Sequence, residues 1–155
     1  MKKLLLVFTH LAAIGLGFAL GIYALPILIA PPAPTAVEVG AQVGANALKG
    51  HFKRDLEGSD ALHWGEGTVS VGTRSIGLAG RLAPGPDYKL YLSPEFVETE
   101  DDFLRVKPRM VRVGDVKTFE NFVVPVPEGI DPARFTTVIV WCETFNQFIT
   151  AARYR

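Results

Sequence analysis

The sequence predicts an all-β fold, a small antiparallel β-sandwich or barrel-like domain, preceded by one N-terminal transmembrane helix. Two observations lead to this prediction. Beyond Leu62, apolar residues recur with a period of two and turn residues interrupt them roughly every 8–12 positions, as in sandwiches and barrels. Ahead of that region, an uncharged stretch of 27 residues runs from Leu4 to Ala30, whereas a membrane helix needs only about 20.

Residues 1–30 are expected to form an uncleaved membrane anchor, because their apolar run exceeds the roughly 7–15 residues of a signal-peptide core. A cleavable signal is the alternative, since Ala24 and Ala30 are small residues near its end. Lys2 and Lys3 are the nearest cations, so the positive-inside rule places the N-terminus in the cytoplasm. The rest of the chain would then be extracytoplasmic, and periplasmic in a bacterium.

Composition leaves room for one globular domain after the anchor. Residues 31–50 are rich in Pro, Gly and Ala, and we expect them to form a stalk; the domain is expected over residues 51–155. Apart from Lys2 and Lys3, the chain carries 14 basic and 16 acidic residues. This balance provides no electrostatic footprint for nucleic acid, so we predict no nucleic-acid partner.

The domain is expected to consist of short strands separated by turns. The segments with extended patterns are 68–71, 75–78, 87–93, 109–113, 119–126, 137–142 and a last strand after a bend near 146–147. Pro125 and Pro127 favour an edge position for the strand 119–126, because proline cannot donate to a sheet. The acidic segment 98–102 is expected to be a solvated loop, and Asp131-Pro132 to begin a short helical turn.

The strand 137–142 is expected to be central, because it is apolar on both faces. Alternation places Val138, Val140 and Cys142 on one face and leaves the other to Ile139 and Trp141. Cys142 is the only cysteine in the chain. An unpaired thiol in an oxidising compartment is either shielded or chemically employed.

Several motifs together resemble the DM13 domain. They are the run Gly85-Pro86-Asp87-Tyr88-Lys89-Leu90-Tyr91-Leu92-Ser93, Gly114 with Phe119 and Pro125 after it, the run Val138-Ile139-Val140-Trp141-Cys142-Glu143-Thr144-Phe145-Asn146, and His63 followed by Gly67. The resemblance covers roughly His51 to Tyr154. The chain differs by having Phe119 where the family leads us to expect tyrosine.

The resemblance implies a compact extracytoplasmic β domain, of a kind often tethered to membranes or joined to haem-binding and redox modules. It also implies that the cysteine after tryptophan, here Cys142, carries redox chemistry as a bare thiol or as a ligand. His63 is the candidate orienting or ligating neighbour, and Trp141 is a candidate neighbour of any bound cofactor.

Activation of Cys142 requires a cation or dipole, because the thiolate is the reactive form. No adjacent residue supplies positive charge, and Glu143 would disfavour the thiolate. Folding would therefore have to bring His63, Arg153 or another group near the thiol.

The sequence specifies no cofactor. Non-covalent haem remains open, because Cys or His can ligate iron. A copper site could draw on His51, His63, Cys142 and Met110, but their spacing is unlike that of such sites, and we predict no metal site.

The first functional hypothesis is a membrane-anchored extracytoplasmic domain with a redox or electron-transfer role centred on Cys142 and a redox partner protein. The alternative is a non-catalytic binding or scaffold domain of the cell envelope, in which Cys142 is only packed.

Overall fold

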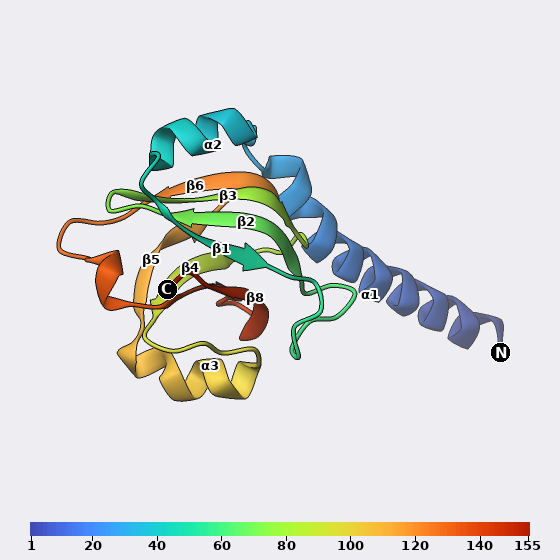
Figure 1. Cartoon of the computed structure of the whole chain (residues 1–155). Coiled ribbons are helices and arrows are strands. Elements are labelled where there is room, and N and C mark those ends of the chain that lie inside the picture. Colours follow the sequence, from blue (N-terminus) through green and yellow to red (C-terminus); the bar gives the residue numbers. More distant parts are fainter.

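The computed structural model describes residues 1–155 as two stacked antiparallel sheets of four strands with a long helix projecting from one side (Figure 1). One sheet has the order β1-β2-β3-β6 and the other β5-β4-β7-β8. The strands are β1 (Leu48–Phe52), β2 (Gly65–Val71), β3 (Ser75–Leu82), β4 (Tyr88–Ser93), β5 (Val111–Val116), β6 (Glu120–Pro125), β7 (Thr137–Cys142) and β8 (Gln147–Arg153). The helices are α1 (Lys2–Ile29), α2 (Ala36–Val43), α3 (Glu100–Val106) and the short 3-10 turns η1 (Lys107–Arg109) and η2 (Pro132–Arg134). The predicted all-β sandwich with an N-terminal helix is confirmed.

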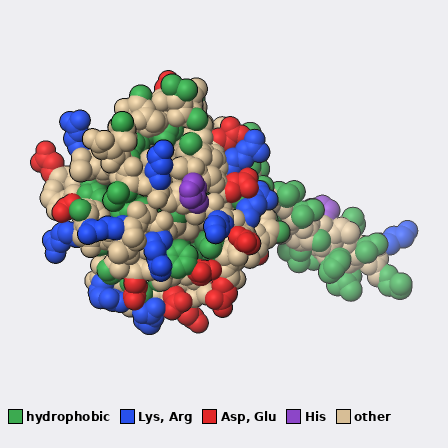
Figure 2. All heavy atoms as spheres, in the orientation of Figure 1, with side chains coloured by type: hydrophobic (Ala, Val, Ile, Leu, Met, Phe, Trp, Pro, Cys, Tyr) green, Lys and Arg blue, Asp and Glu red, His purple; other side chains and the backbone are tan.

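Helix α1 is long and apolar enough to cross a membrane. None of its residues is buried against the domain, and apolar side chains cover it along its length (Figure 2). On the face of the β domain shown in the same view, charged side chains of both signs are interspersed. The apolar surface of α1 suits contact with lipid, whereas the charged surface of the β domain suits contact with water.

The segment expected to be a stalk differs from that expectation. Thr35 caps α2 through a capping box with Glu38, and the helix lies against β3 and β6 instead of extending freely. Gly77 of β3 makes the contact possible, since a Cβ there would lie 2.6 Å from Val39 and 2.8 Å from Val43. The strand β1 also begins at Leu48, inside the expected stalk. The small, weakly apolar residues of α2 therefore pack against the first sheet instead of forming a free stalk.

The sandwich core lies between the two sheets and follows the predicted alternation. Val138, Val140 and Cys142 of β7 face the core, together with Tyr88, Leu90 and Leu92 of β4. The predicted central position of β7 is confirmed, because it pairs with β4 on one side and β8 on the other. The predicted edge position of β6 and the cap at Asp131 are also confirmed.

Helix α3 covers the outer face of the second sheet. The ring of Phe103 stacks on Trp141 at a centroid distance of 3.8 Å and meets Tyr91 edge-on at 5.3 Å. The predicted acidic loop is wrong from Glu100 onward: Thr99 caps the helix, and three acidic residues occupy its first turn, where the helix dipole favours negative charge.

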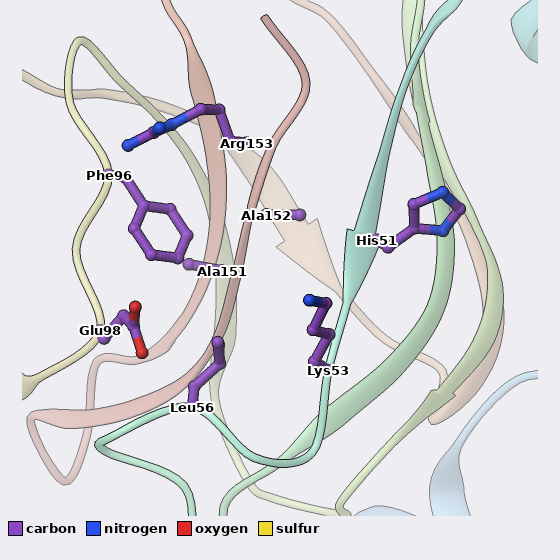
Figure 3. A pocket seen from close by; sticks show the side chains of 8 residues that line it. All are labelled: His51, Lys53, Leu56, Phe96, Glu98, Ala151, Ala152 and Arg153. Atoms are coloured by element: carbon purple, nitrogen blue, oxygen red, sulfur yellow. The ribbon is translucent and has the colours of Figure 1, made fainter.

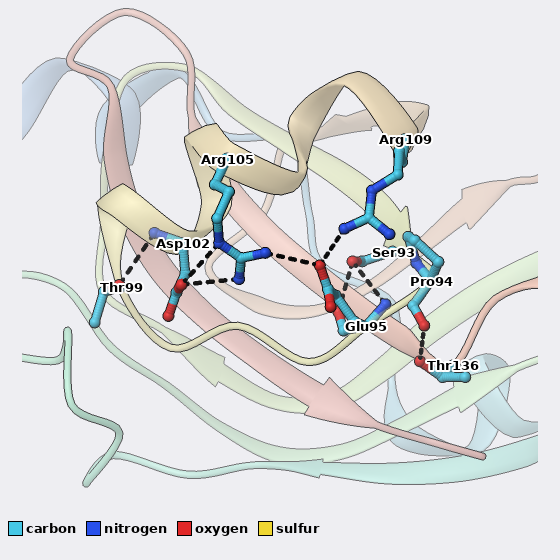
Figure 4. A network of polar contacts seen from close by, with 8 residues as sticks. All are labelled: Ser93, Pro94, Glu95, Thr99, Asp102, Arg105, Arg109 and Thr136. Atoms are coloured by element: carbon cyan, nitrogen blue, oxygen red, sulfur yellow. Dashed lines mark hydrogen bonds and ion pairs between the residues drawn. The ribbon is translucent and has the colours of Figure 1, made fainter.

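A polar network joins α3 to the segment after β4 (Figure 4). Arg105 donates to Glu95 at 3.0 Å and to Asp102 at 2.9 Å, and Arg109 also donates to Glu95. These side chains are exposed, and exposed ion pairs contribute little to stability. The buried aromatic stack therefore accounts for most of the attachment of α3.

Replacing Phe103 with Ala should lower the free energy of unfolding by about 3–5 kcal/mol, because it removes a fully buried ring from this stack. Replacing Leu104, which is 48% exposed on the same helix, with Ala should change it by less than about 0.5 kcal/mol. Urea unfolding of the full chain in detergent measures both values. Equal effects of the two substitutions would contradict this packing.

Candidate functional site

A cavity of about 410 Å³ lies at one end of the sandwich, where the domain meets α1. Cys142 and His63 both line it. The remaining wall comes from Leu62 beside His63, from the turn before β4, from β4 and β8 with the loop before β8, and from three residues of α1, Ala19, Ile22 and Tyr23. The structure thus brings the two principal candidates from the sequence to one cavity.

The position of Cys142 follows from strand pairing. It is the last residue of β7, opposite Tyr88 of β4 and Gln147 of β8, at the point where the core ends. The residue is only 2% exposed. Burial raises the pKa of the Cys142 thiol, and the charge of Asp87 adds to the rise, whereas the backbone N–H groups of Phe145, Asp87 and Thr144 partly oppose it.

Glu143 does not act on the thiol as the sequence suggested. Strand alternation turns it to the other face of the sheet, where Tyr91 donates to one carboxylate oxygen and Lys107 Nζ donates to the other at 2.9 Å. Burial alone would raise the pKa of Glu143, but these two partners lower it. The carboxylate that disfavours the Cys142 thiolate is Asp87.

A tight turn fixes His63. Asp60 Oδ1 accepts from the backbone N–H groups of Leu62 at 2.6 Å and His63 at 2.8 Å, and Asp60 Oδ2 lies 2.8 Å from His63 Nδ1. The hydrogen bond to His63 is the main reason why the pKa of Asp60 is lowered. An ionised carboxylate only accepts, so Nδ1 must carry the proton. Nε2 is therefore the ring atom available to a ligand.

The other candidates from the sequence lie elsewhere. Trp141 is fully buried on the opposite face of β7, against Phe103. Met110 packs against the same group of buried side chains, which includes Trp141 and Phe103. His51 lies on β1, where its ring is 3.4 Å from the Thr68 hydroxyl. The potential copper ligands are thus dispersed, and no group of three or more His, Cys, Asp or Glu side chains that could hold a metal occurs.

A second cavity, of about 520 Å³, opens between the edge strands β1 and β8 (Figure 3). Lys53 and Arg153 contribute cationic groups to it, His51 lines it from β1, and Phe96 and Glu98 lie opposite β1. It places Arg153 away from Cys142, so Arg153 is not the activating cation that the sequence allowed. No thiol lines this cavity.

Sequence reasoning missed three parts of the first cavity: Tyr88, the turn over it, and α1. Tyr88 donates from its hydroxyl to the carbonyl of Ala83 at 2.8 Å, and Phe119 meets its ring edge-on at 5.9 Å. Gly85 lies directly on the ring, since a Cβ there would come within 2.5 Å of it. The Pro84-Gly85-Pro86 turn carried a signal for this close approach.

A protein-family comparison decides the family. The model described as "Electron transfer DM13" matches residues 52–154. The chain belongs to the DM13 family. The comparisons with curated proteins and with solved structures gave no match.

The match places the DM13 domain from the end of β1 to the residue after β8, so α1 and α2 precede it. All residues lining the cavity belong to the DM13 domain except the three from α1. The cavity is therefore a feature of the DM13 domain that helix α1 completes.

The raised pKa of Cys142 predicts slow alkylation by iodoacetamide. Because a free thiol ionises with a pKa of about 8.5, its rate levels off above that pH, while the rate for Cys142 should still be rising there. Replacing Asp87 with Asn should move the rise to lower pH by removing a negative charge. Asp101→Asn on α3 is the matched control and should leave the profile unchanged. A wild-type profile like that of a free thiol would contradict the assignment.

Proposed function

We propose that this chain is a membrane-anchored, extracytoplasmic DM13 domain that transfers electrons through Cys142. The observation that supports this most is that the single thiol of an electron-transfer family member lines an open cavity together with an oriented imidazole. A thiol that only fills space in the core would not need to line a cavity.

The membrane topology follows from α1 and its flanks. The helix can span the bilayer, and Lys2 and Lys3 before it favour a cytoplasmic N-terminus. The DM13 domain would then lie outside the cytoplasm, where thiols exchange with disulfides.

The proposed redox step is a two-electron thiol–disulfide exchange. The Cys142 sulfur, as its thiolate, attacks a disulfide of a redox partner protein. The partner's S–S bond breaks, a mixed disulfide with Cys142 forms, and the other partner sulfur leaves and takes up the proton that Cys142 released; the reverse step restores the Cys142 thiol and the partner's disulfide. Because the chain has one cysteine, the second sulfur must come from another molecule. His63 lines the same cavity and is the orienting group: Asp60 holds its Nδ1, and its Nε2 can accept a hydrogen bond from a reacting group.

Haem bound through Cys142 does not suit this cavity. Its propionates are anionic, and no Lys or Arg lines the wall. Burial also favours the protonated thiol of Cys142, whereas an iron ligand must be a thiolate. No step of the proposed function is therefore assigned to iron.

A second candidate function is a binding or scaffold domain of the cell envelope. The 2% exposure of Cys142 and its raised pKa favour this alternative, because both are properties of a packed, unreactive thiol. It differs from the redox proposal in one respect: the folded protein should leave Cys142 unmodified.

Exchange with glutathione separates the two functions. Full-length protein in lipid nanodiscs, incubated with oxidised glutathione, should form a one-to-one mixed disulfide at Cys142 that reduced glutathione reverses. Mass spectrometry of the intact protein measures the adduct, and Cys142→Ser gives the background. The reaction should proceed in folded protein, because Cys142 lines the cavity.

Adduct formation only after unfolding would overturn the redox proposal and leave the scaffold alternative. A parallel absorption spectrum of protein purified from its own membrane should show no visible band. A band would assign the electrons to a bound cofactor instead of the thiol.

A further inference from the structure

The cavity lies at the depth of the outer membrane boundary, given the proposed topology. With Lys2 and Lys3 at the inner surface, the stretch from Leu4 to Tyr23 rises about 30 Å, at about 1.5 Å per residue. That length equals the hydrocarbon thickness of a typical bilayer. Tyr23 is then placed at the outer interface, where aromatic side chains are enriched. The end of α1, residues 24–29, lies beyond that boundary, where Pro26 and Ile29 meet the domain. The cavity wall formed by Ala19 and Ile22 lies on the lipid side of that boundary.

The domain wall of the cavity is also apolar where it meets solvent. Leu62 is 55% exposed and Phe145 is 52% exposed, and both line the cavity beside α1. Exposed large apolar residues grouped at one opening mark a binding or membrane-facing surface. A ligand can thus enter this cavity sideways from the outer leaflet without crossing water.

The lining restricts the ligand to an uncharged molecule. No Lys, Arg, Asp or Glu side chain lines the cavity, so a charged group would be buried there without a partner. Polar side chains are present nevertheless: His63, Cys142 and Gln147 all line the wall. Gln147 already donates to Glu100, and Asp60 holds Nδ1 of His63. A plain acyl chain would therefore leave Nε2 of His63 and the Cys142 thiol without partners, whereas a neutral ring with hydroxyl groups can bind to them.

We propose that this cavity binds a membrane-soluble quinone, which enters from the outer leaflet. The inference rests on the proposed electron-transfer function and names the electron carrier that uses the same site. The reduced ring donates a hydroxyl hydrogen bond to Nε2 of His63, and its apolar tail lies along Ala19 and Ile22 of α1. The cavity volume of about 410 Å³ lies within the range of ligand pockets.

The electron count of a quinone matches that of disulfide formation from two thiols. A quinone takes up two electrons and two protons to become a hydroquinone, and these are the electrons and protons that Cys142 and a partner thiol release when they form a disulfide. Two thiols and one quinone thus give one disulfide and one hydroquinone, with no further reactant.

Filling the cavity from the membrane side tests the proposal without altering the DM13 domain. Ala19→Trp places a large ring against the tail path, and Ala13→Trp makes the same change on α1 at a residue that does not line the cavity. Calorimetry on full-length protein in nanodiscs, with empty nanodiscs as background and oxygen excluded, should show saturable one-to-one binding of a short-tailed benzohydroquinone, the reduced form that can donate to Nε2 of His63. Affinity should fall roughly tenfold or more in Ala19→Trp and stay unchanged in Ala13→Trp.

The absence of saturable binding would overturn the proposal, as would equal affinities of the two tryptophan variants. Equal binding of the same alkyl tail without the ring would also overturn it, because the occupant would then be a lipid chain. Cys142→Ser should bind the hydroquinone as the wild type does, since no bond to sulfur is needed. Hydroquinone binding with an unreactive Cys142 would reject only the redox role of the thiol; a reactive Cys142 without hydroquinone binding would reject only the carrier.

Discussion

Burial of β7 on both of its faces is the constraint on which the rest of the structure depends. One face of the strand supplies Val138, Val140 and Cys142 to the core between the sheets, while Trp141 and Ile139 on the other face require a cover. Helix α3 provides that cover through the stack of Phe103 on Trp141. The strand β7 pairs with β4 on one side and with β8 on the other, and both pairings fix its register. Cys142, its last residue, is therefore held at the boundary between core and cavity.

The same burial sets the chemistry of the thiol. It raises the pKa of Cys142, and the negative charge of Asp87 raises it further, so the protonated thiol is the resting form near neutral pH. Glu143 has no part in this, because Tyr91 and Lys107 hold it on the other face. An uncharged lining and a protonated thiol are consistent with each other, and both agree with the proposal that the site binds neutral molecules and moves protons together with electrons.

The alternation of side chains along a strand was enough to predict which residues of β4 and β7 lie on each face, because successive residues of a strand point to opposite sides of the sheet. It could not predict the docking of α2, which depends on the missing side chain of Gly77 in a strand far along the chain. The helix α3 was missed because its acidic first turn suits a loop as well as a helix start. Its status as the only cysteine brought Cys142 into consideration and the family resemblance brought His63, but only the fold places both in one cavity. The contribution of α1 to that cavity depends on the direction in which the chain leaves Ile29, and no local pattern encodes it.

The redox state of Cys142 in its native membrane tests the account most directly. Cells grown under reducing and oxidising conditions can be quenched in acid, and free and oxidised thiols can then be tagged with reagents of different mass. The account predicts that full-length protein with an intact α1 changes reversibly between a free thiol and a disulfide-bonded Cys142 as conditions change. A Cys142 that remains a free thiol under both conditions, and that reacts only after the domain is unfolded, would contradict it.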